Sequence, residues 1–309
     1  MFIEILGSAA GGGFPQWNCN CSNCQSLRGG TFQGKARTQL QVAITGDRQR
    51  YFLLNASPDL RLQIEAAPRL HPRNGLRDSP ISGVLLTSGD IDQVAGLLSL
   101  RELQPFPVYS TRSIRGILRE DNSLFAMLNR VPNQVSWHEI TPGRTFSLLD
   151  SAGADSGIRC EPFSLATHYP AYISAQRLAA LRPEEALLGL ILESSSGKRL
   201  AYLPAVPAID DTLMQRLESA DLLLFDGTFW SDDELIPVQG GGATAHEMGH
   251  VPVSGAAGSL QKLAGLRRPR KMFIHINNTN PMLDESGPQY REVRNAGWQI
   301  AEDKSSFDL

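Results

Sequence analysis

A short apolar run that ends in a group of polar residues is the most informative pattern along the chain. The run from Val84 to Leu86 has the length and residue types of a buried strand. The polar residues that follow at once are Ser88, Asp90, Asp92 and Gln93. Apolar residues then recur at helical spacing from Val94 onward. A strand, a polar turn and a helix N-terminus in this order are a usual place for a site in α/β proteins.

The two aspartates of this turn also have a purely local interpretation. Asp92 can serve as the N-cap of the helix, and Asp90 can serve as a turn residue. Spacing alone does not separate the local interpretation from a functional one, so both stay open at this point.

The hydrophobic pattern predicts strands and helices along the whole chain. Strands are expected at residues 2–6, 38–45, 51–54, 84–86, 107–110, 134–138, 144–149, 158–165, 187–193, 199–203, 222–225 and 272–276. Helices are expected after Asp59, from the polar turn to about residue 103, near 112–130, from Asp210 to 219, and from Ser254 to about 266. No repeat or linker divides the chain, so we expect one α/β domain over residues 1–309, with two sheets packed together and helices outside.

Composition and charge exclude several classes of function. The chain has 309 residues, of which 41% are hydrophobic, and a net charge of -3, so no nucleic acid partner is indicated. No apolar run reaches the ~20 residues that a membrane span needs. The apolar N-terminus lacks the basic residues of a signal peptide and is expected to form the first strand. A cytoplasmic location is therefore expected.

Three cysteines lie on one tight loop, in the pattern Cys19-Asn20-Cys21-Ser22-Asn23-Cys24. Zinc prefers tetrahedral thiolate and imidazole ligands, and this loop supplies three corners of such a site. The alternative, three free cysteines on a loop, is chemically hazardous. We expect a structural zinc with a fourth ligand from elsewhere in the chain. The remaining cysteine, Cys160, is isolated and is expected to be a packed, inert thiol.

The segment from His246 to His250 matches the HExxH pattern of zinc proteases. That chemistry requires both histidines on one face of a stable helix. Gly249 lies inside the motif and Pro252 follows it closely, so a long helix is not expected here. Thr244 and Glu247 have the spacing of a capping box. We reject the protease interpretation, although either histidine can still act singly.

Taken together, several stretches resemble the metallo-β-lactamase superfamily, and within it the family that acts in the synthesis of the redox cofactor pyrroloquinoline quinone (PQQ). The stretches that carry the resemblance are residues 7–21, 55–59, 226–230, 248–250 and 275–281. The resemblance covers nearly the whole chain. It implies an αββα sandwich of two mixed sheets with outer helices, and a site at one edge of the sheets. It also implies a substrate, a cross-linked Glu–Tyr precursor derived from a peptide.

The usual metal motif of this superfamily, HxHxDH, is largely replaced in this chain. Its positions fall on Ser88, Asp90, Asp92 and Gln93, so only the aspartate is kept. The bridging aspartate of the superfamily falls near residues 203–204, where no aspartate stands, whereas the final histidine is His275. A two-metal hydrolytic site therefore cannot form, and hydrolysis by a metal-bridging hydroxide is not expected.

The resemblance implies a mononuclear site instead. In similar proteins the position of Gln93 is commonly histidine, and with Asp92 and His275 it would form the face of two histidines and one carboxylate that suits non-haem iron and oxygen chemistry. An amide binds a metal more weakly than imidazole does. We therefore leave open whether Gln93, Asp90 or His250 completes an Fe²⁺ site. Asp90, Asp92, Gln93, His250 and His275 are expected to converge at one sheet edge.

The resemblance also implies roles for the other polar residues. His250 matches an acid–base histidine of related phosphodiesterases, so we expect His250 and Asp90 to be catalytic. Ser88 and Asp226 are expected to bind substrate. Asn278 stands where cyclic phosphodiesterases of the superfamily carry the histidine that closes the zinc site, so it is the expected fourth zinc ligand. His168 can approximate the missing middle histidine, although a surface position is the more common alternative.

Three functions compete at this point. The first is an iron-dependent oxygenase that hydroxylates the tyrosine-derived ring of the precursor. The second is a carrier without chemistry that binds PQQ or its precursor and assists its transport to the periplasm. The third, a hydrolase, is disfavoured by the missing ligands. The expected partners are a small-molecule PQQ precursor or PQQ itself, and other proteins of PQQ biosynthesis. The oligomeric state is left open.

Overall fold

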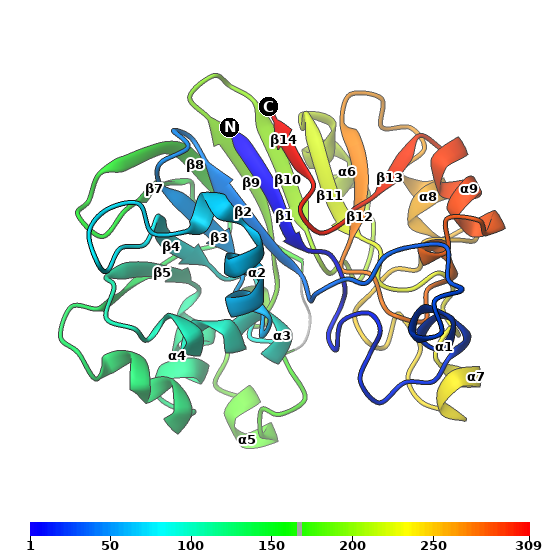
Figure 1. Cartoon of the computed structure of the whole chain (residues 1–309), viewed down its shortest axis with the longest axis horizontal. Helices are drawn as coiled ribbons and strands as arrows, with labels where there is room; N and C mark the ends of the chain where they lie inside the picture. Colours follow the sequence, from blue (N-terminus) through cyan, green and yellow to red (C-terminus); the bar gives the residue numbers. More distant parts are fainter. Residues whose placement is uncertain (166–168) are drawn as a thin grey trace. The chain divides into compact units, whose positions relative to one another are not determined.

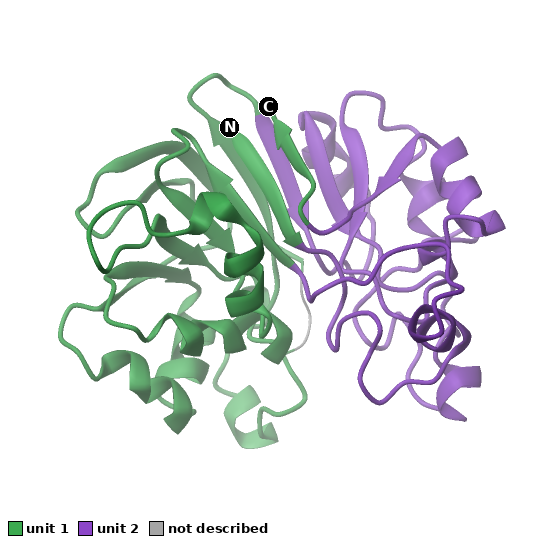
Figure 2. Ribbon diagram, viewed as in Figure 1, with its two compact units in different colours: residues 1–6, 41–198, 304–309 green, residues 7–40, 199–303 purple. Residues whose placement is uncertain are grey.

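The computed structural model describes residues 1–165 and 169–309, and the chain divides into two compact units. Unit 1 comprises residues 1–6, 41–198 and 304–309, and unit 2 comprises residues 7–40 and 199–303 (Figure 2). Both units are assembled from segments that are far apart in the sequence. The expected single domain over residues 1–309 stays a prediction. None of the helices in the described part of the chain combines the length and the hydropathy that crossing a bilayer requires.

Unit 1 is built on a mixed sheet of seven strands in the order β14-β1-β2-β3-β4-β5-β6 (Figure 1). The strands are β1 (Phe2–Gly7), β2 (Gln41–Thr45), β3 (Tyr51–Leu54), β4 (Ile81–Leu85), β5 (Phe106–Ser110), β6 (Val135–Glu139) and β14 (Ser306–Asp308). β14 pairs antiparallel with β1 and β2 with β3, whereas β3 to β6 run parallel. The polar turn at Ser88 therefore lies beyond the carboxyl end of a parallel strand, where α/β proteins commonly bind ligands.

Three further strands of unit 1 pair antiparallel. They are β7 (Phe146–Leu149), β8 (Asp155–Ser164) and β9 (Leu188–Ser194). The hydroxyl of Tyr109, on β5, donates to the carbonyl of Leu149 and accepts from the Leu149 N–H, each at 2.8 Å. The Tyr109 ring also stacks on Phe146. These contacts hold β7 to the seven-stranded sheet within unit 1.

Helices cover the seven-stranded sheet of unit 1 and share its core. They are α2 (Leu60–Ala66), η1 (Pro68–Leu70), α3 (Ile91–Val94), η2 (Ala95–Leu100), α4 (Arg112–Arg119) and η3 (Ser123–Asn129), and the unit also holds α5 (Ala175–Leu178) and η4 (Pro183–Glu185). Leu60, Leu97 and Ile114 pack with strand residues such as Val84 and Val108 in one buried cluster. The single long helix expected to reach about residue 103 is replaced by α3 and the 3₁₀ helix η2, which ends at Leu100.

Unit 2 holds four parallel strands in the order β13-β12-β11-β10. They are β10 (Arg199–Leu203), β11 (Leu222–Asp226), β12 (Arg270–Ile274) and β13 (Trp298–Ile300). The helices of this unit are α1 (Ser22–Arg28), α6 (Asp211–Glu218), α7 (Ile236–Gln239), α8 (Ser259–Lys262), η5 (Pro281–Leu283) and α9 (Pro288–Asn295). Because the strands are parallel, the residues that end β11 and follow β12 lie at the same edge.

The helix expected from Ser254 to about residue 266 is wrong in both its start and its length. Only α8, Ser259–Lys262, forms there. The Ser254 hydroxyl donates to the carbonyl of Trp230 at 2.7 Å instead of capping a helix. Gly255, at φ +86°, holds a left-handed conformation that interrupts any helix starting at Ser254. The sequence reasoning also missed α9, β13 and β14.

Candidate functional site

The ends of β11 and β12 bring Asp226 next to His275. In the parallel ladder Asp226 pairs with Ile274, so the residue after Ile274 stands beside the aspartate. His275 adopts a left-handed backbone conformation, with φ +55°. Residues other than glycine rarely adopt this conformation, although histidine does so more readily than most, and here it directs the His275 side chain toward Thr228.

Asp226 is fully buried, and each of its carboxylate oxygens has two partners. Oδ1 accepts from the N–H of Thr228 at 3.0 Å and from its hydroxyl at 2.7 Å. Oδ2 accepts from the N–H of Val206 at 2.8 Å and lies 2.8 Å from Nδ1 of His250. An ionised carboxylate only accepts hydrogen bonds, so Nδ1 of His250 carries the hydrogen. This tautomer places the lone pair of the imidazole on Nε2.

Thr228 does for His275 what Asp226 does for His250. The Thr228 hydroxyl, which donates to Asp226, lies 2.8 Å from Nδ1 of His275. With its one hydrogen given to the carboxylate, this hydroxyl accepts from the imidazole N–H. His275 is thereby also assigned the tautomer with a lone pair on Nε2. A neutral imidazole in this tautomer is the form that a metal ligand or a general base needs.

The two imidazole rings lie close together. Their centroids are 5.4 Å apart, with 19° between the ring planes. One ligand atom from each of Asp226, His250 and His275 lies within 4.8 Å of the others, which is close enough for a shared cation. Because both oxygens of Asp226 already have partners within the unit, we interpret Asp226 as the residue that orients His250.

In unit 1, the polar turn after β4 is held together by local bonds. The Ser88 hydroxyl donates to Oδ2 of Asp90 at 2.7 Å and accepts from the Asp90 N–H at 3.1 Å. Asp90 occupies the N-cap position of α3 and makes no side-chain capping bond, whereas Asp92 lies in the first turn. The local interpretation therefore misplaced the N-cap, which is Asp90 and not Asp92.

Gln93 is buried and its amide oxygen belongs to a network. Oε1 accepts from Nδ2 of Asn55 and from the hydroxyl of Thr87, each at 2.9 Å. Asn55 in turn accepts from the N–H of Thr87 at 2.8 Å. Metal ligation by Gln93 stays a prediction, but the oxygen that a metal would bind already accepts two hydrogen bonds.

The two residues expected to bind substrate are placed differently. Ser88 is 1% exposed and Asp226 0% exposed, and both are bonded to their own surroundings. Neither side chain has a surface to offer a substrate as folded. Substrate binding by Ser88 and Asp226 stays a prediction; as folded, the Ser88 hydroxyl positions Asp90, and the Asp226 carboxylate positions His250.

The expected convergence spans the two units. The structure brings His250 and His275 together within unit 2, and Ser88 and Asp90 together within unit 1. That Asp90, Asp92 and Gln93 meet the two histidines stays a prediction. His168 lies outside the described residues.

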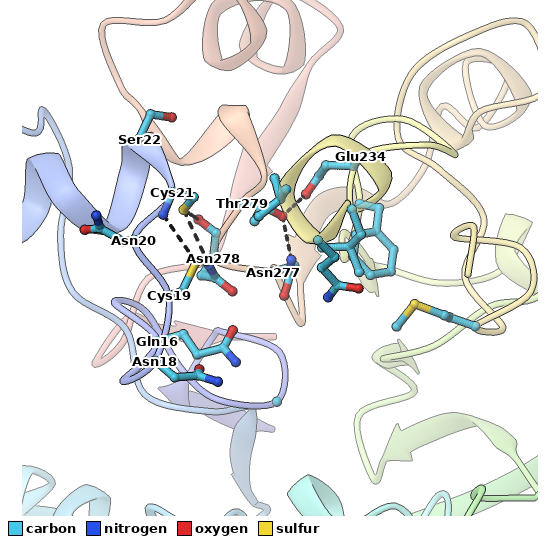
Figure 3. Close-up of a pocket in the computed structure, with 16 residues that line it drawn as sticks. Gln16, Asn18, Cys19, Asn20, Cys21, Ser22, Glu234, Asn277, Asn278 and Thr279 are labelled. Atoms are coloured by element: carbon cyan, nitrogen blue, oxygen red, sulfur yellow. Dashed lines mark hydrogen bonds between the residues drawn. The ribbon is translucent and has the colours of Figure 1, made fainter. Parts of the chain in front are cut away.

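The cysteine loop of unit 2 gathers its three thiols at one point. One ligand atom from each of Cys19, Cys21 and Cys24 lies within 4.8 Å of the others. The side-chain amide of Asn278 caps them, with Nδ2 at 3.1, 3.6 and 3.3 Å from the sulfurs of Cys19, Cys21 and Cys24. Figure 3 shows this amide beside Cys19 and Cys21. Rotating this amide group by 180° about its Cβ–Cγ bond places the oxygen, instead of the nitrogen, beside the three sulfurs. The Arg28 guanidinium closes the loop by donating to the carbonyl of Cys19.

The thiols differ in how their surroundings affect ionisation. Burial raises the pKa of Cys24 to about 11. Burial also opposes ionisation of Cys19, but hydrogen bonds from Cys21, Asn278 and Cys24 outweigh it and lower the Cys19 pKa. Burial strongly raises the pKa of Cys160, which agrees with an inert thiol. Three thiolates on one loop repel one another, so a bound cation would stabilise their ionised form.

The HExxH segment forms turns rather than a helix. Residues 245–249 are in turns, and Gly249 has φ +84°. His246 lies at the surface with Nδ1 2.7 Å from Asp232, whereas His250 is buried beside Asp226. The capping-box bonds between Thr244 and Glu247 are nevertheless present, at 2.8 and 3.2 Å. The two histidines therefore do not share a helix face.

Sequence reasoning missed Thr228 and Glu234. Thr228 follows the strand-ending Asp226 by two residues, and that spacing is the signal for a local side-chain bond. Glu234 carried no motif. Its carboxylate accepts from the hydroxyl of Thr279 (Figure 3) and from the N–H of Trp230. Burial raises the pKa of Glu234 to about 7.

Comparison with known proteins identifies the fold and the relatives of the chain. The model of the Beta-lactamase superfamily domain matches residues 50–276. Coenzyme PQQ synthesis protein B of Methylorubrum extorquens is 41% identical over 309 residues, which are 100% of both chains. The protein of the same name from Azotobacter vinelandii is 43% identical over 309 residues, again 100% of both chains.

Solved structures identify the same family and the same fold. The crystal structure of Zn(2+)-bound PqqB from Methylobacterium extorquens matches with a TM-score of 0.91 at 42% identity over 100% of both chains. A diphosphatase from the PhnP family shares the fold, with a TM-score of 0.68 at 19% identity over 100% of this chain and 97% of that one. The predicted fold class, a metallo-β-lactamase fold of the α/β class with two mixed sheets and helices, is confirmed.

Proposed function

Because this chain belongs to the family of coenzyme PQQ synthesis protein B, within the β-lactamase superfamily, we propose that it acts in PQQ biosynthesis as an iron-dependent oxygenase. The proposed reaction hydroxylates the tyrosine-derived ring of the cross-linked Glu–Tyr precursor. One oxygen atom of O₂ enters a ring C–H bond to give C–OH. The other leaves as water, with two electrons from an external reductant and two protons.

The main support for this proposal is that His250 and His275 are both held in a fixed orientation. Asp226 fixes His250 and Thr228 fixes His275, each through Nδ1 and each with the lone pair assigned to Nε2. The two rings are stacked and almost parallel, and one ligand atom from each lies within 4.8 Å of the other, which is close enough for a shared small ligand. One imidazole suits metal binding and the other proton transfer.

The available residues fit a single metal ion rather than two. His275 and Asp92 would hold Fe²⁺, and the third ligand would come from Gln93, Asp90 or His250. Bound iron would activate O₂ for attack on the ring. Engagement of the Gln93 oxygen by Asn55 and Thr87 favours the latter two residues. With Asp90 as the third ligand, His250 would hold or accept a proton at Nε2, and Asp226 would stabilise the imidazolium that results.

The cysteine loop supports a second, structural metal. Three sulfurs and the Asn278 amide surround one point, and an amide oxygen there completes four ligands. We assign Zn²⁺ to Cys19, Cys21, Cys24 and Asn278. The site leaves no ligand position for substrate, so its role is to hold the loop in place.

The decisive experiment is an anaerobic Fe²⁺ titration of the zinc-loaded protein, followed by O₂, a reductant and the precursor, with products detected by mass. We expect one Fe²⁺ per chain and a product that has gained one oxygen atom. His275→Ala and Asp92→Ala should lose iron binding and product together. Asp211→Ala is the matched control, because Asp211 is an exposed aspartate in the first turn of α6. Full product formation without iron would contradict the proposal.

A carrier of PQQ or its precursor is the second candidate, and the placement of Gln93 favours it. The Gln93 amide oxygen already accepts hydrogen bonds from Asn55 and Thr87, so it contributes little to a metal site. The proposed iron site then lacks a strong third ligand at this position. A carrier should bind PQQ equally in the wild type, His275→Ala and Asp92→Ala, and none of them should form product. In either role, other proteins of PQQ biosynthesis are the proposed partners, and the cytoplasm is the proposed location.

A further inference from the structure

A pocket of about 720 Å³ lies beside the cysteine loop, within unit 2 (Figure 3). One side is formed by residues 16 and 18–22 of the loop and by the turn after β12. The other side is formed by Phe229, the segment Glu234–Gln239 and Met248. Neither the proposed oxygenase chemistry nor the structural zinc accounts for a space of this size. It falls within the size range of sites that bind small molecules or peptide segments.

Carboxamides dominate the polar lining of this pocket. The six are Gln16, Asn18, Asn20, Gln239, Asn277 and Asn278. Asn277 and Asn278 are engaged with Thr279 and the thiols. Within the described part of the chain, the other four side-chain amides make no hydrogen bond. A carboxamide both donates and accepts, which is also what a backbone peptide group does.

The charges of the lining exclude other polar ligands. Among the residues that form the pocket, none is lysine, arginine or histidine, so a phosphate or carboxylate finds no counter-charge. The one carboxylate is Glu234, and its two oxygens already accept from Thr279 and Trp230. A cationic ligand therefore meets at most this one carboxyl group, which is already hydrogen-bonded on both oxygens. The lining fits an uncharged ligand rich in amide groups.

The remaining surface of the pocket is apolar. It is formed by Phe229, Leu235, Val238 and Met248, of which Val238 is 46% and Met248 41% exposed. An extended peptide presents its side chains alternately to opposite sides and its N–H and C=O groups between them. Such a chain can meet the carboxamides with its backbone while one of its apolar side chains packs on Val238 and Met248.

A sugar would also use carboxamides, but it usually needs the open face of an aromatic ring. The one aromatic residue of the lining is Phe229, which is 2% exposed and packs edge to face with His250 at a centroid distance of 5.7 Å. Its ring therefore has no open face for stacking. A free short peptide is disfavoured for a different reason, because its ammonium and carboxylate ends find no opposite charge here.

We propose that this pocket binds an uncharged segment internal to a longer polypeptide, in extended conformation. The bound segment belongs to a partner chain. Its backbone pairs with Gln16, Asn18, Asn20 and Gln239, and an apolar side chain occupies the wall at Val238 and Met248. This inference is independent of the oxygenase chemistry, since it uses no residue of the proposed iron site.

The test follows methyl signals in the full, zinc-loaded chain labelled with ¹³C at the methionine methyl groups. The probe is the capped peptide N-acetyl-Ser-Leu-Thr-Val-amide. We expect the Met248 methyl signal, assigned with Met248→Leu, to shift and saturate. The internal control is Met127, which is 42% exposed on η3 in unit 1 and should not move. Absence of a saturable shift at Met248 would overturn the proposal.

Two variants and two further probes sharpen the test. Asn20→Ala and Gln239→Ala should each weaken the peptide about fivefold, the effect of one lost hydrogen bond. Gln261→Ala, an exposed glutamine on α8 outside the pocket, should leave the affinity unchanged. The same peptide with free termini should bind more weakly, and maltose should not shift Met248. Equal or tighter binding of the free peptide, or saturation by maltose, would refute the internal-segment assignment.

Discussion

The carboxylate of Asp226 holds Nδ1 of His250 at 2.8 Å from a position with no exposure to solvent. The other three donors to this carboxylate come from Val206 and Thr228. Because these donors hold the carboxylate in place, the aspartate determines which nitrogen of His250 carries the hydrogen. Asp226, at the end of β11, thus sets the tautomer of His250, which lies on a loop farther along the chain.

Asp226→Asn should separate this orienting role from metal binding. An asparagine cannot accept from all four donors, so its NH₂ group must face either His250 or a backbone N–H. We expect turnover to fall about a hundredfold or more, the usual size of an acid–base contribution. With Asp90 as the third iron ligand, Fe²⁺ affinity, measured by the same anaerobic titration, should stay at the wild-type value; weaker Fe²⁺ binding would assign that position to His250.

The matched control for this variant is Asp221→Asn. Asp221 accepts from the N–H of Arg199 at 2.9 Å and lies next to the opposite end of β11, far along the strand from His250. The Asp221→Asn variant should have a lower melting temperature but the same turnover per folded molecule as the wild type. Wild-type turnover in Asp226→Asn would show that His250 does not act in catalysis through this tautomer.

The fourth ligand of the cysteine site can be tested at Asn278. Asn278→Asp keeps an oxygen at the position now occupied by the amide, so the variant should retain one zinc per chain. Asn278→Leu and Cys21→Ser each remove a ligand and should lower zinc content and melting temperature together. Metal analysis and thermal unfolding measure both. If Asn278→Leu binds zinc as tightly as the wild type, another group or a water molecule closes the site.

Most strands were predictable from the sequence, and the reason is their burial. The run Leu222–Phe225 is apolar throughout because parallel strands are covered on both faces, and it lies within β11 as the structure has it. The error at Ser254 has an equally physical cause. A serine before a partly apolar stretch has the pattern of an N-cap, but its hydroxyl is used by the distant carbonyl of Trp230. No local pattern contains that contact.

The site was predictable in part, through residue type rather than geometry. The cysteine loop and His275 followed from motifs, whereas the buried network around Gln93 did not. Asn55 contacts Gln93 from a segment that is 38 residues away in the sequence. Thr87 contacts it from the turn that precedes α3. Thr228 was equally hidden, because the strand ladder that places it beside His275 joins β11 to β12. Such partners depend on tertiary register.

Glu234 makes stability depend on pH. Burial raises its folded-state pKa from 4.5 to about 7, so the folded protein binds a proton that the unfolded chain releases. The associated stability is therefore fully present below pH 4.5 and is lost as the pH rises through 7, by about 3 kcal/mol in the free energy of unfolding. Urea unfolding of the zinc-loaded protein between pH 4.5 and 8 measures it.

Glu234→Gln should remove this component of the pH dependence, since a carboxamide does not titrate. The control is Glu218→Gln, which changes a solvent-exposed carboxyl at the end of α6 and should keep the wild-type slope. Parallel pH profiles for the wild type and Glu234→Gln would show that the proton is bound elsewhere.

Gln93→His tests whether the depleted ligand set limits the activity. The new imidazole supplies the strong third ligand that the proposed site lacks, so Fe²⁺ should bind more tightly and turnover should rise. The same change disturbs the network, because Asn55 and Thr87 lose the oxygen to which both donate. We expect a loss of about 1 kcal/mol in the free energy of unfolding, the usual effect of one lost hydrogen bond, because Asn55 and Thr87 keep each other as partners.

Gln93→Leu separates the two effects, since it removes the same acceptor without adding a metal ligand. It should destabilise the fold to a similar extent and leave Fe²⁺ affinity at or below the wild-type value. Iron affinity, product formation and urea unfolding are measured on all three proteins.

Tighter iron binding in Gln93→His alone means that the glutamine is a weakened ligand position. Unchanged iron binding in Gln93→His, with an active wild type, means that Asp90 or His250 completes the site. If no variant reacts and all bind PQQ equally, the carrier function explains the chain better, because the network around Gln93 then serves only to hold the polar turn in place.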